Sequence, residues 1–187
     1  YGLSTGGAAI GVPPRFGVRH HEWDRPTALR FGRAVEDLGL VWIEEPLDAY
    51  DADGHAALAR ELATPVASGE MLTSVAEHKR LMDAGAVDFI QPDAPRVGGI
   101  TEFLKIMALA HDKGLMMAPH FAMEIHLHLC AAYPSEPWVE HLEWLAPLFN
   151  ERLTFTDGRM AVPGRAGLGL SLSEQARAWP VARQTFG

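Results

Sequence analysis

The amino-acid sequence predicts an α/β fold with a parallel sheet, assembled from repeated strand–helix units. From about residue 24 onward, short apolar runs alternate with segments of roughly 10 to 16 residues whose apolar positions repeat with helical spacing. The short runs are nearly continuously apolar, which is typical of strands buried on both faces in a barrel or a doubly wound sheet. No glycine-rich phosphate loop follows the first run, so the sequence disfavours a dinucleotide-binding fold.

The first unit shows the pattern most fully. Asp24 is a candidate N-cap for a helix over 26–39, which Gly39 ends. The apolar run 40–46 follows as a strand, and Pro46 stops it because proline cannot donate a ladder hydrogen bond. Further strands are expected over 65–70, 87–93, 115–120 and 137–143, helices over 53–63, 74–85, 99–114 and 124–133, and a hairpin around the Asp157-Gly158 turn.

The composition limits the classes of partner. The 187 residues are enough for one sizeable core, and 48% hydrophobic with 21% charged residues describes a soluble globular chain. A formal charge of -8 gives no general attraction to nucleic acid or anionic lipid. No apolar run has the length of a membrane span and residues 1–20 show no signal-peptide pattern, so we expect a cytoplasmic protein without a membrane partner. The single cysteine, Cys130, cannot form an internal disulfide and is interpreted as a packing residue.

Each expected strand ends on acidic side chains or a histidine: Glu44 and Glu45, Glu70, Asp93, His120, and Glu140. In a parallel barrel the carboxyl ends of all strands meet at one face, so these distant residues should converge. Several carboxylates in one mouth repel each other unless a cation lies among them. The pattern therefore predicts a site for a hard divalent cation, most simply Mg²⁺.

His120 is the candidate base of this site. It is the strand-end side chain whose ordinary pKa suits proton transfer near neutral pH. Asp93, one strand earlier, is placed to accept a hydrogen bond from the other ring nitrogen and so to fix the tautomer. The set fits removal of a proton next to a carboxylate, with the cation stabilising the enediolate. His126 and His128, on an expected helix, are interpreted as surface or packing residues.

Several phrases of the sequence occur in the order and spacing of a known family: WIEEP, GE, QPDAPRVGG, APHFAMEIHLHL and EPWVEH. From about Trp23 onward the chain resembles the mandelate racemase/muconate lactonizing family of the enolase superfamily. Within it, GEMLTS and PLFNERL resemble the L-talarate/galactarate dehydratases most. The resemblance implies a partial TIM-type (β/α)7β barrel, the enolase C-terminal domain-like fold, over residues 23–187, after an irregular segment 1–22.

The resemblance also implies a role for each strand-end residue. Glu44 and Glu70 would ligate Mg²⁺, and His120, paired with Asp93, would act as general base or acid. Glu140 would hydrogen-bond the substrate carboxylate and support the enediolate, whereas Glu45 matches an acid that is not usually a direct ligand. The implied reaction is the Mg²⁺-dependent dehydration of a hexaric acid such as galactarate or L-talarate.

Two features of the family are missing from the sequence. Enzymes of this family carry an N-terminal capping domain and early barrel strands, one with a Lys-x-Lys pair and the next ending in Asp-Ala-Asn with the third metal ligand. The sequence contains no Lys-x-Lys, and Val18-Arg19-His20 occupies the Asp-Ala-Asn position. We therefore expect a barrel lacking the capping domain and early strands, and interpret this stretch as a seam left by lost or altered sequence. The alternative is a replacement ligand from His20, His21 or Glu22.

Three hypotheses about function stay open at this point. The first is an acid-sugar dehydratase, and the second is a racemase or epimerase of the same family. The third is a catalytically impaired homologue that acts as a fragment or assembly subunit, and exposed barrel edges favour a homo-oligomer. Arg96 argues against muconate-lactonizing chemistry, because its guanidinium is too basic to replace the lysine expected on this strand.

Overall fold

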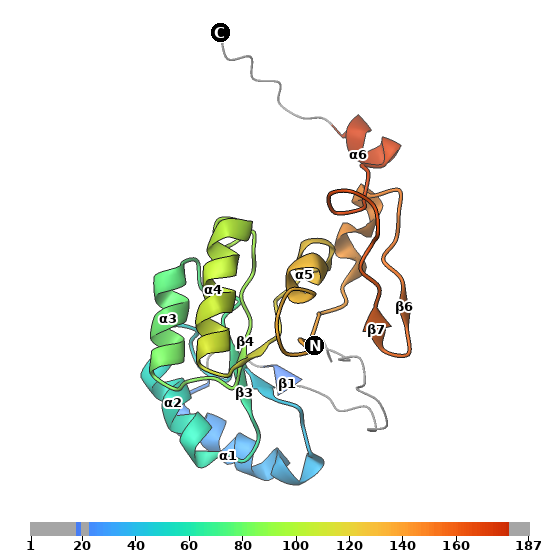
Figure 1. The fold of residues 1–187 in the computed structure, drawn as a ribbon. Helices are drawn as coiled ribbons and strands as arrows, with labels where there is room; N and C mark the ends of the chain where they lie inside the picture. Colours follow the sequence, from blue (N-terminus) through green and yellow to red (C-terminus); the bar gives the residue numbers. More distant parts are fainter. Residues whose placement is uncertain (1–17, 20–22, 180–187) are drawn as a thin grey trace.

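The computed structural model describes residues 18–19 and 23–179, which form a row of parallel strand–helix units followed by a hairpin region (Figure 1). The parallel strands are β1 (Val18–Arg19), β2 (Ile43–Glu44), β3 (Val66–Ser68), β4 (Phe89–Ile90) and β5 (Met116–Met117). The helices among them are α1 (Arg25–Val35), α2 (Ala52–Glu61), α3 (Val75–Asp83), α4 (Ile100–Asp112) and α5 (Met123–Cys130), with a 3-10 turn at Glu36–Leu38. The C-terminal part contains a 3-10 helix (Glu143–Leu148), strands β6 (Phe155–Thr156) and β7 (Arg159–Met160), and helix α6 (Glu174–Ala178).

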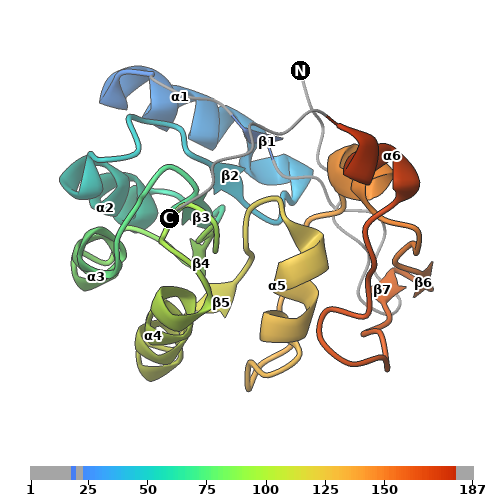
Figure 2. The same cartoon turned by 90° about the horizontal axis from the view of Figure 1, so that it is seen from above.

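The five parallel strands lie in chain order, β1-β2-β3-β4-β5. A doubly wound sheet reverses its strand order at a switch point, whereas here each strand is added at the same edge. Seen from above, α1 to α4 follow the outer side of a curved row of strands (Figure 2). The arrangement is that of a sector of a (β/α) barrel, which decides between the two architectures that the apolar runs left open.

The helix boundaries follow the capping signals in the sequence. The Asp24 carboxylate accepts a hydrogen bond from the amide of Thr27 (2.7 Å), which starts α1. Gly39 ends this region in the left-handed conformation with φ 62°. The hairpin is also confirmed: β6 and β7 are antiparallel, and Asp157 and Gly158 between them both have positive φ.

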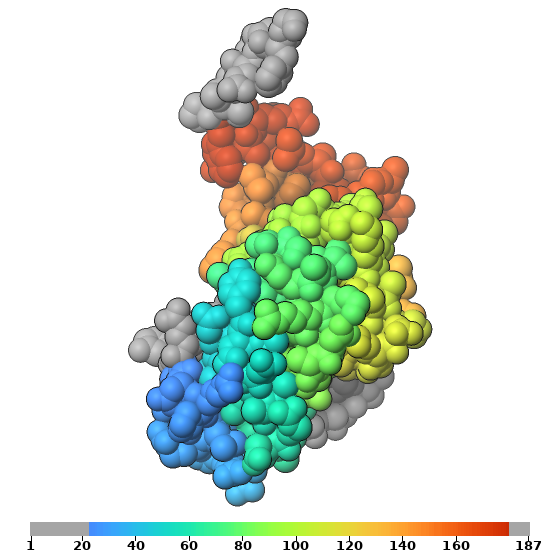
Figure 3. Space-filling view, turned by 90° about the vertical axis from the view of Figure 1, so that its left-hand side faces the viewer, coloured from blue at the N-terminus to red at the C-terminus, as the bar shows by residue number. Residues whose placement is uncertain are grey.

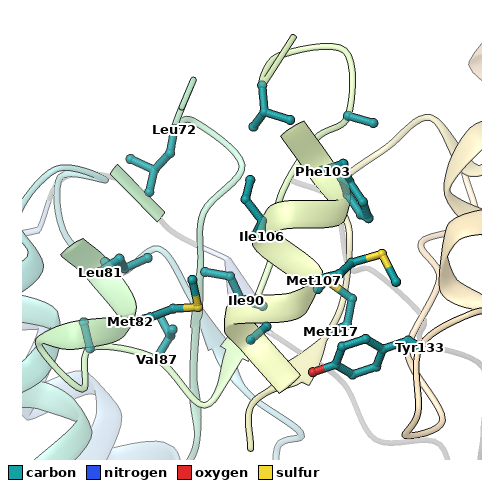
Figure 4. Close-up of a cluster of buried hydrophobic side chains, with 14 of the residues drawn as sticks. Leu72, Leu81, Met82, Val87, Ile90, Phe103, Ile106, Met107, Met117 and Tyr133 are labelled. Carbon is teal, nitrogen blue, oxygen red and sulfur yellow. The ribbon is translucent and has the colours of Figure 1, made fainter. Parts of the chain in front are cut away.

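Two groups of buried apolar side chains hold the helices on the sheet. The larger group lies between α3, α4 and the strands, where Leu81, Ile90, Ile106 and Met117 are almost completely buried (Figure 4). A smaller group, which includes Ile43, packs α1 and α2 against β2 and β3. Because of this packing, α1 to α4 form one continuous outer surface (Figure 3). Burial of apolar area on this scale is the main stabilising term of such a unit.

Two segments differ from the sequence-based expectation. The expected strand over 137–143 is wrong as a regular strand: Trp138 donates one backbone hydrogen bond to Met117 (2.9 Å), and a 3-10 helix starts at Glu143. Leu142 is already the N-cap of this 3-10 helix, so the extended part of the segment is too short for a regular strand. At the other edge, β1 places Val18–Arg19 of the expected irregular segment in the sheet, in register with β2.

Candidate active site

The expected site residues follow successive strands at one edge of the sheet. Ladder hydrogen bonds continue beyond the strand ends, since the amide of Gln91 donates to the carbonyl of Ser68 (3.0 Å) and the amide of His120 to that of Pro92 (3.2 Å). These bonds hold the residues after β3, β4 and β5 in register with each other. The strand-end side chains are therefore brought to one face by the backbone itself, as the parallel topology predicted.

Asp93 and His120 form a directly hydrogen-bonded pair. The Asp93 Oδ2 atom lies 2.9 Å from His120 Nδ1, and Asp93 Oδ1 accepts the backbone N–H of Arg96 at 2.9 Å. Burial would raise the pKa of Asp93, but the hydrogen bonds from His120 and Arg96 outweigh it and lower that pKa. Asp93 is thus a stable anion that holds the His120 ring with its proton on Nδ1.

The other ring nitrogen of His120 faces Glu70. Its Nε2 atom lies 3.5 Å from Glu70 Oε2, and the His120 side chain remains 15% exposed. Burial would lower the pKa of His120, but the hydrogen bond with Asp93 and the charges of Glu70 and Glu140 raise it. The ring can therefore accept a proton on Nε2 and be stabilised as a cation by the acids around it.

Glu44 is a buried carboxylate at the end of β2. Its Oε2 atom accepts hydrogen bonds from the indole N–H of Trp42 (3.0 Å) and from the side-chain amide of Gln91 (2.8 Å). Trp42 is itself held by ring contacts with Phe89 and Trp138, at centroid distances of 5.0 and 5.7 Å. This packing fixes the direction in which the carboxylate points.

Glu70 is placed by an unusual backbone. Gly69 before it has φ 136°, and a Cβ at that position would lie 3.1 Å from the backbone nitrogen of Gln91. Only glycine allows β3 to pass so close to the chain that follows β4. The guanidinium of Arg96 then donates to the Glu70 carbonyl at 3.1 Å, which ties this strand end to the Asp93 loop.

Glu45 and Glu140 have different surroundings. Glu45 is fully buried with φ 39°, and its Oε1 atom lies 3.3 Å from the hydroxyl of Ser68, so its carboxylate contacts the end of β3. Glu140 is partly exposed, and its Oε2 atom accepts the backbone N–H of Phe121 at 2.6 Å. Glu140 thus lies beside the residue that follows His120, although its own segment is not a regular strand.

The donor set fits part of a magnesium site. Glu44 and Glu70 are nearly buried carboxylates at neighbouring strand ends, and carboxylate oxygens are ligands that Mg²⁺ prefers. Among the residues that the structure describes, no group of three or more His, Cys, Asp and Glu side chains is arranged to hold a metal ion. The third metal ligand is expected after β1, in which Arg19 is the register partner of Glu44 on β2. The candidate ligands His20, His21 and Glu22 lie outside the described residues.

Sequence reasoning missed the residues that support the site. Gln91 binds Glu44 across the sheet, a contact that no local pattern encodes. Trp42 lies two residues before Glu44 on the same extended segment, where i,i+2 spacing puts both side chains on one face, and that signal was overlooked. Arg96 was considered only as an unsuitable base, yet it braces both Asp93 and Glu70. His126 was interpreted as surface or packing; it is fully buried, but its ring also makes two hydrogen bonds to the backbone.

Comparison with known proteins identifies the family. A family model described as enolase C-terminal domain-like matches residues 19–176. The chain belongs to the mandelate racemase/muconate lactonizing family of the enolase superfamily. The resemblance in the sequence phrases and the expected fold class are thereby confirmed. In the described part of the chain, no helix combines the length and the apolar character that a membrane span requires.

Individual relatives within the family are dehydratases and a cycloisomerase. The L-talarate/galactarate dehydratase of Salmonella typhimurium is 62% identical over 168 residues, which are 90% of this chain and 42% of the relative. The crystal structure of L-talarate dehydratase from Polaromonas sp. JS666, complexed with Mg and L-glucarate, is 63% identical with a TM-score of 0.87, over 91% of this chain and 46% of that one. The 3,6-anhydro-alpha-L-galactonate cycloisomerase of Streptomyces coelicolor is 32% identical, over 81% and 42% of the two chains. The chain therefore spans less than half the length of these relatives.

Proposed function

We propose that this chain carries the general base and two magnesium ligands of an acid-sugar dehydratase. The observation that carries the proposal is the Asp93–His120 pair, joined at 2.9 Å, with His120 Nε2 3.5 Å from Glu70. Support for the substrate class comes from the relatives, one named L-talarate/galactarate dehydratase and one crystallised with Mg and L-glucarate. Galactarate and L-talarate are therefore the substrates to test first.

In this proposal His120 removes the proton from the carbon next to a substrate carboxylate. Because Nδ1 donates to Asp93, the lone pair of Nε2 accepts the proton, and the anionic Asp93 stabilises the resulting imidazolium. The electrons of the broken C–H bond pass into the enediolate of that carboxylate. Glu44 and Glu70 would hold Mg²⁺, whose positive charge would supply stabilisation for the enediolate. Glu140 is assigned the contact with the substrate carboxylate, through a proton shared between the two carboxyl groups.

The second half of the reaction is the loss of water. The electrons of the enediolate form a carbon–carbon double bond, and the bond from the β-carbon to its hydroxyl breaks. A proton joins the departing hydroxide, which leaves as water, and the remaining enol becomes the keto acid by tautomerisation. His120, as an imidazolium, is a proton donor within the described site for the leaving group.

The test uses galactarate and L-talarate with Mg²⁺ in ²H₂O, followed by proton NMR and a keto-acid assay. Loss of substrate with formation of keto acid, abolished by His120→Asn, is the expected result. Exchange of the α-proton without keto acid would instead support the racemase or epimerase hypothesis. If the wild-type protein binds Mg²⁺ but shows no proton exchange and forms no keto acid, the result would support the hypothesis of a catalytically impaired homologue.

Assembly and location are further parts of the proposal. We infer a homo-oligomer, because Trp144 is 76% exposed and Phe155 52% exposed in the C-terminal region, and apolar surface of this kind favours burial against another chain. Sedimentation velocity should give a mass above that of one chain. The acidic net charge argues against nucleic acid or an anionic membrane as a partner. Cell fractionation should place the protein in the cytoplasm.

A further inference from the structure

His126 on α5 connects two backbone positions that flank the catalytic pair. The side chain is fully buried. Its Nε2 atom accepts the backbone N–H of Ala94 at 2.9 Å, and its Nδ1 atom lies 3.2 Å from the carbonyl oxygen of Phe121. Ala94 directly follows Asp93, and Phe121 directly follows His120. One rigid ring thus bridges the loop after β4 and the loop after β5.

The two partners define the protonation of the ring. An amide N–H can only donate, so Nε2 must carry a lone pair; a carbonyl can only accept, so Nδ1 must carry the hydrogen. A doubly protonated ring would direct an N–H at the N–H of Ala94. Burial lowers the pKa of His126 to about 4, which agrees with a neutral ring. Phe103 stacks on the ring with a centroid distance of 5.2 Å and so fixes its plane.

Both backbone polar groups of Phe121 have partners. Its N–H donates to Glu140 at 2.6 Å, and its carbonyl faces His126. The residue itself has φ 58°, a left-handed conformation that is uncommon for a bulky side chain and needs such support. The N–H of Phe121 belongs to the peptide group that it shares with the carbonyl of His120, so its bond to Glu140 restrains the backbone next to the His120 side chain.

We propose that His126 is a positioning residue that sets the geometry of the Asp93–His120 pair by joining the backbone behind each partner through a single neutral imidazole. The inference rests on the proposed role of that pair in proton transfer. Its test measures hydrogen bonds and tautomers and needs no turnover, so a failure of the dehydratase assay leaves it untouched.

The first measurement uses the wild-type protein. Nitrogen-15 NMR of labelled histidine at about pH 7 should show His126 with a protonated Nδ1 and an unprotonated Nε2, and a coupling across the hydrogen bond from the Ala94 amide. A His126 ring protonated on Nε2, or on both nitrogens, would overturn the proposal without any substitution.

The second measurement uses two half-replacements. His126→Asn places its amide nitrogen near Nδ1 and keeps the donor to Phe121, whereas His126→Gln places its oxygen near Nε2 and keeps the acceptor for Ala94. We expect exchange of the Ala94 amide hydrogen to become about tenfold faster in His126→Asn and to stay near the wild-type rate in His126→Gln. Equal exchange rates in both variants would contradict the assigned bridge.

The effect on the pair is read from the tautomer of His120 at one fixed alkaline pH. Wild type should show His120 protonated on Nδ1 alone, and each half-replacement should give a mixture of tautomers. The matched control is His128→Gln on the same helix, whose ring contacts the carbonyl of Leu168 at 3.1 Å and should leave His120 unchanged. A single Nδ1 tautomer in both His126 variants, with circular dichroism of the folded chain, would refute the positioning role. If a variant does not fold, the wild-type measurement decides.

Discussion

Lowering the pH from about 8 to about 5 should destabilise the folded chain through His126. The pKa of this buried ring is about 4 in the folded state, below its ordinary value of 6.5. Between these two pH values the ring is protonated in the unfolded chain and neutral in the folded chain. Its contribution to stability is present above pH 6.5 and is lost as the pH falls toward 4. At about pH 5 the loss amounts to about 2 kcal/mol of unfolding free energy.

Comparison with His126→Asn isolates this contribution. Burial also lowers the pKa values of His55 and His78, but these rings titrate equally in both proteins and cancel in the difference. At about pH 8 wild type should be more stable by about 1–3 kcal/mol, because the variant leaves the Ala94 amide without its acceptor. At about pH 5 the two proteins should be nearly equal.

Urea unfolding, followed by circular dichroism, measures the difference in unfolding free energy between wild type and His126→Asn at each of the two pH values. The midpoints convert to free energies if the slopes with urea agree between the proteins. If this difference in unfolding free energy is the same at both pH values, His126 is protonated as easily in the folded as in the unfolded chain. That result would refute the reasoning from burial and from the two backbone partners.

Three other predictions concern the site and the core. Glu70→Gln should weaken Mg²⁺ binding at least about tenfold in calorimetry, because a neutral amide replaces an anionic ligand, and an unchanged affinity would remove Glu70 from the ligand set. Gly69→Ala should lower the unfolding free energy measured with urea by about 1–3 kcal/mol, because alanine is strained at φ 136° and its Cβ meets the backbone of Gln91. Gly114→Ala, with φ 67° and open space around the Cβ, is the control for backbone strain alone. Cys130 is buried and its pKa is raised to about 12, so a thiol reagent should label it only after urea unfolding, and rapid labelling of the native protein would contradict the structure.

The sequence predicted those parts of the molecule that follow local rules. Asp24 and Gly39 marked the ends of the first helical region because capping depends on a few neighbouring residues. Asp93 and His120 could be paired in advance because parallel topology brings successive strand ends together. The prediction of a strand over 137–143 was wrong because the residue pattern does not show that a 3-10 helix begins at Glu143 and shortens the extended segment.

The supporting contacts could not be predicted in the same way. The Gln91 amide reaches Glu44 across the sheet, and the His126 ring reaches two loops from a helix. Such contacts depend on the separation of backbones in three dimensions. Helical or strand periodicity in a sequence carries no information about that separation. A buried histidine and a surface histidine look alike in a sequence of mixed polarity, so His126 was assigned to the commoner class.

The chain order of the sheet has a consequence for synthesis on the ribosome. Because every strand from β2 to β5 pairs with the strand made just before it, each unit can dock on a finished edge as soon as it emerges. Glu44 and Glu70 precede Asp93 and His120 in the chain, so their strands emerge first. The two carboxylates proposed as metal ligands thus emerge before the pair proposed for proton transfer, and the pairing of β2 to β5 does not depend on the hairpin region.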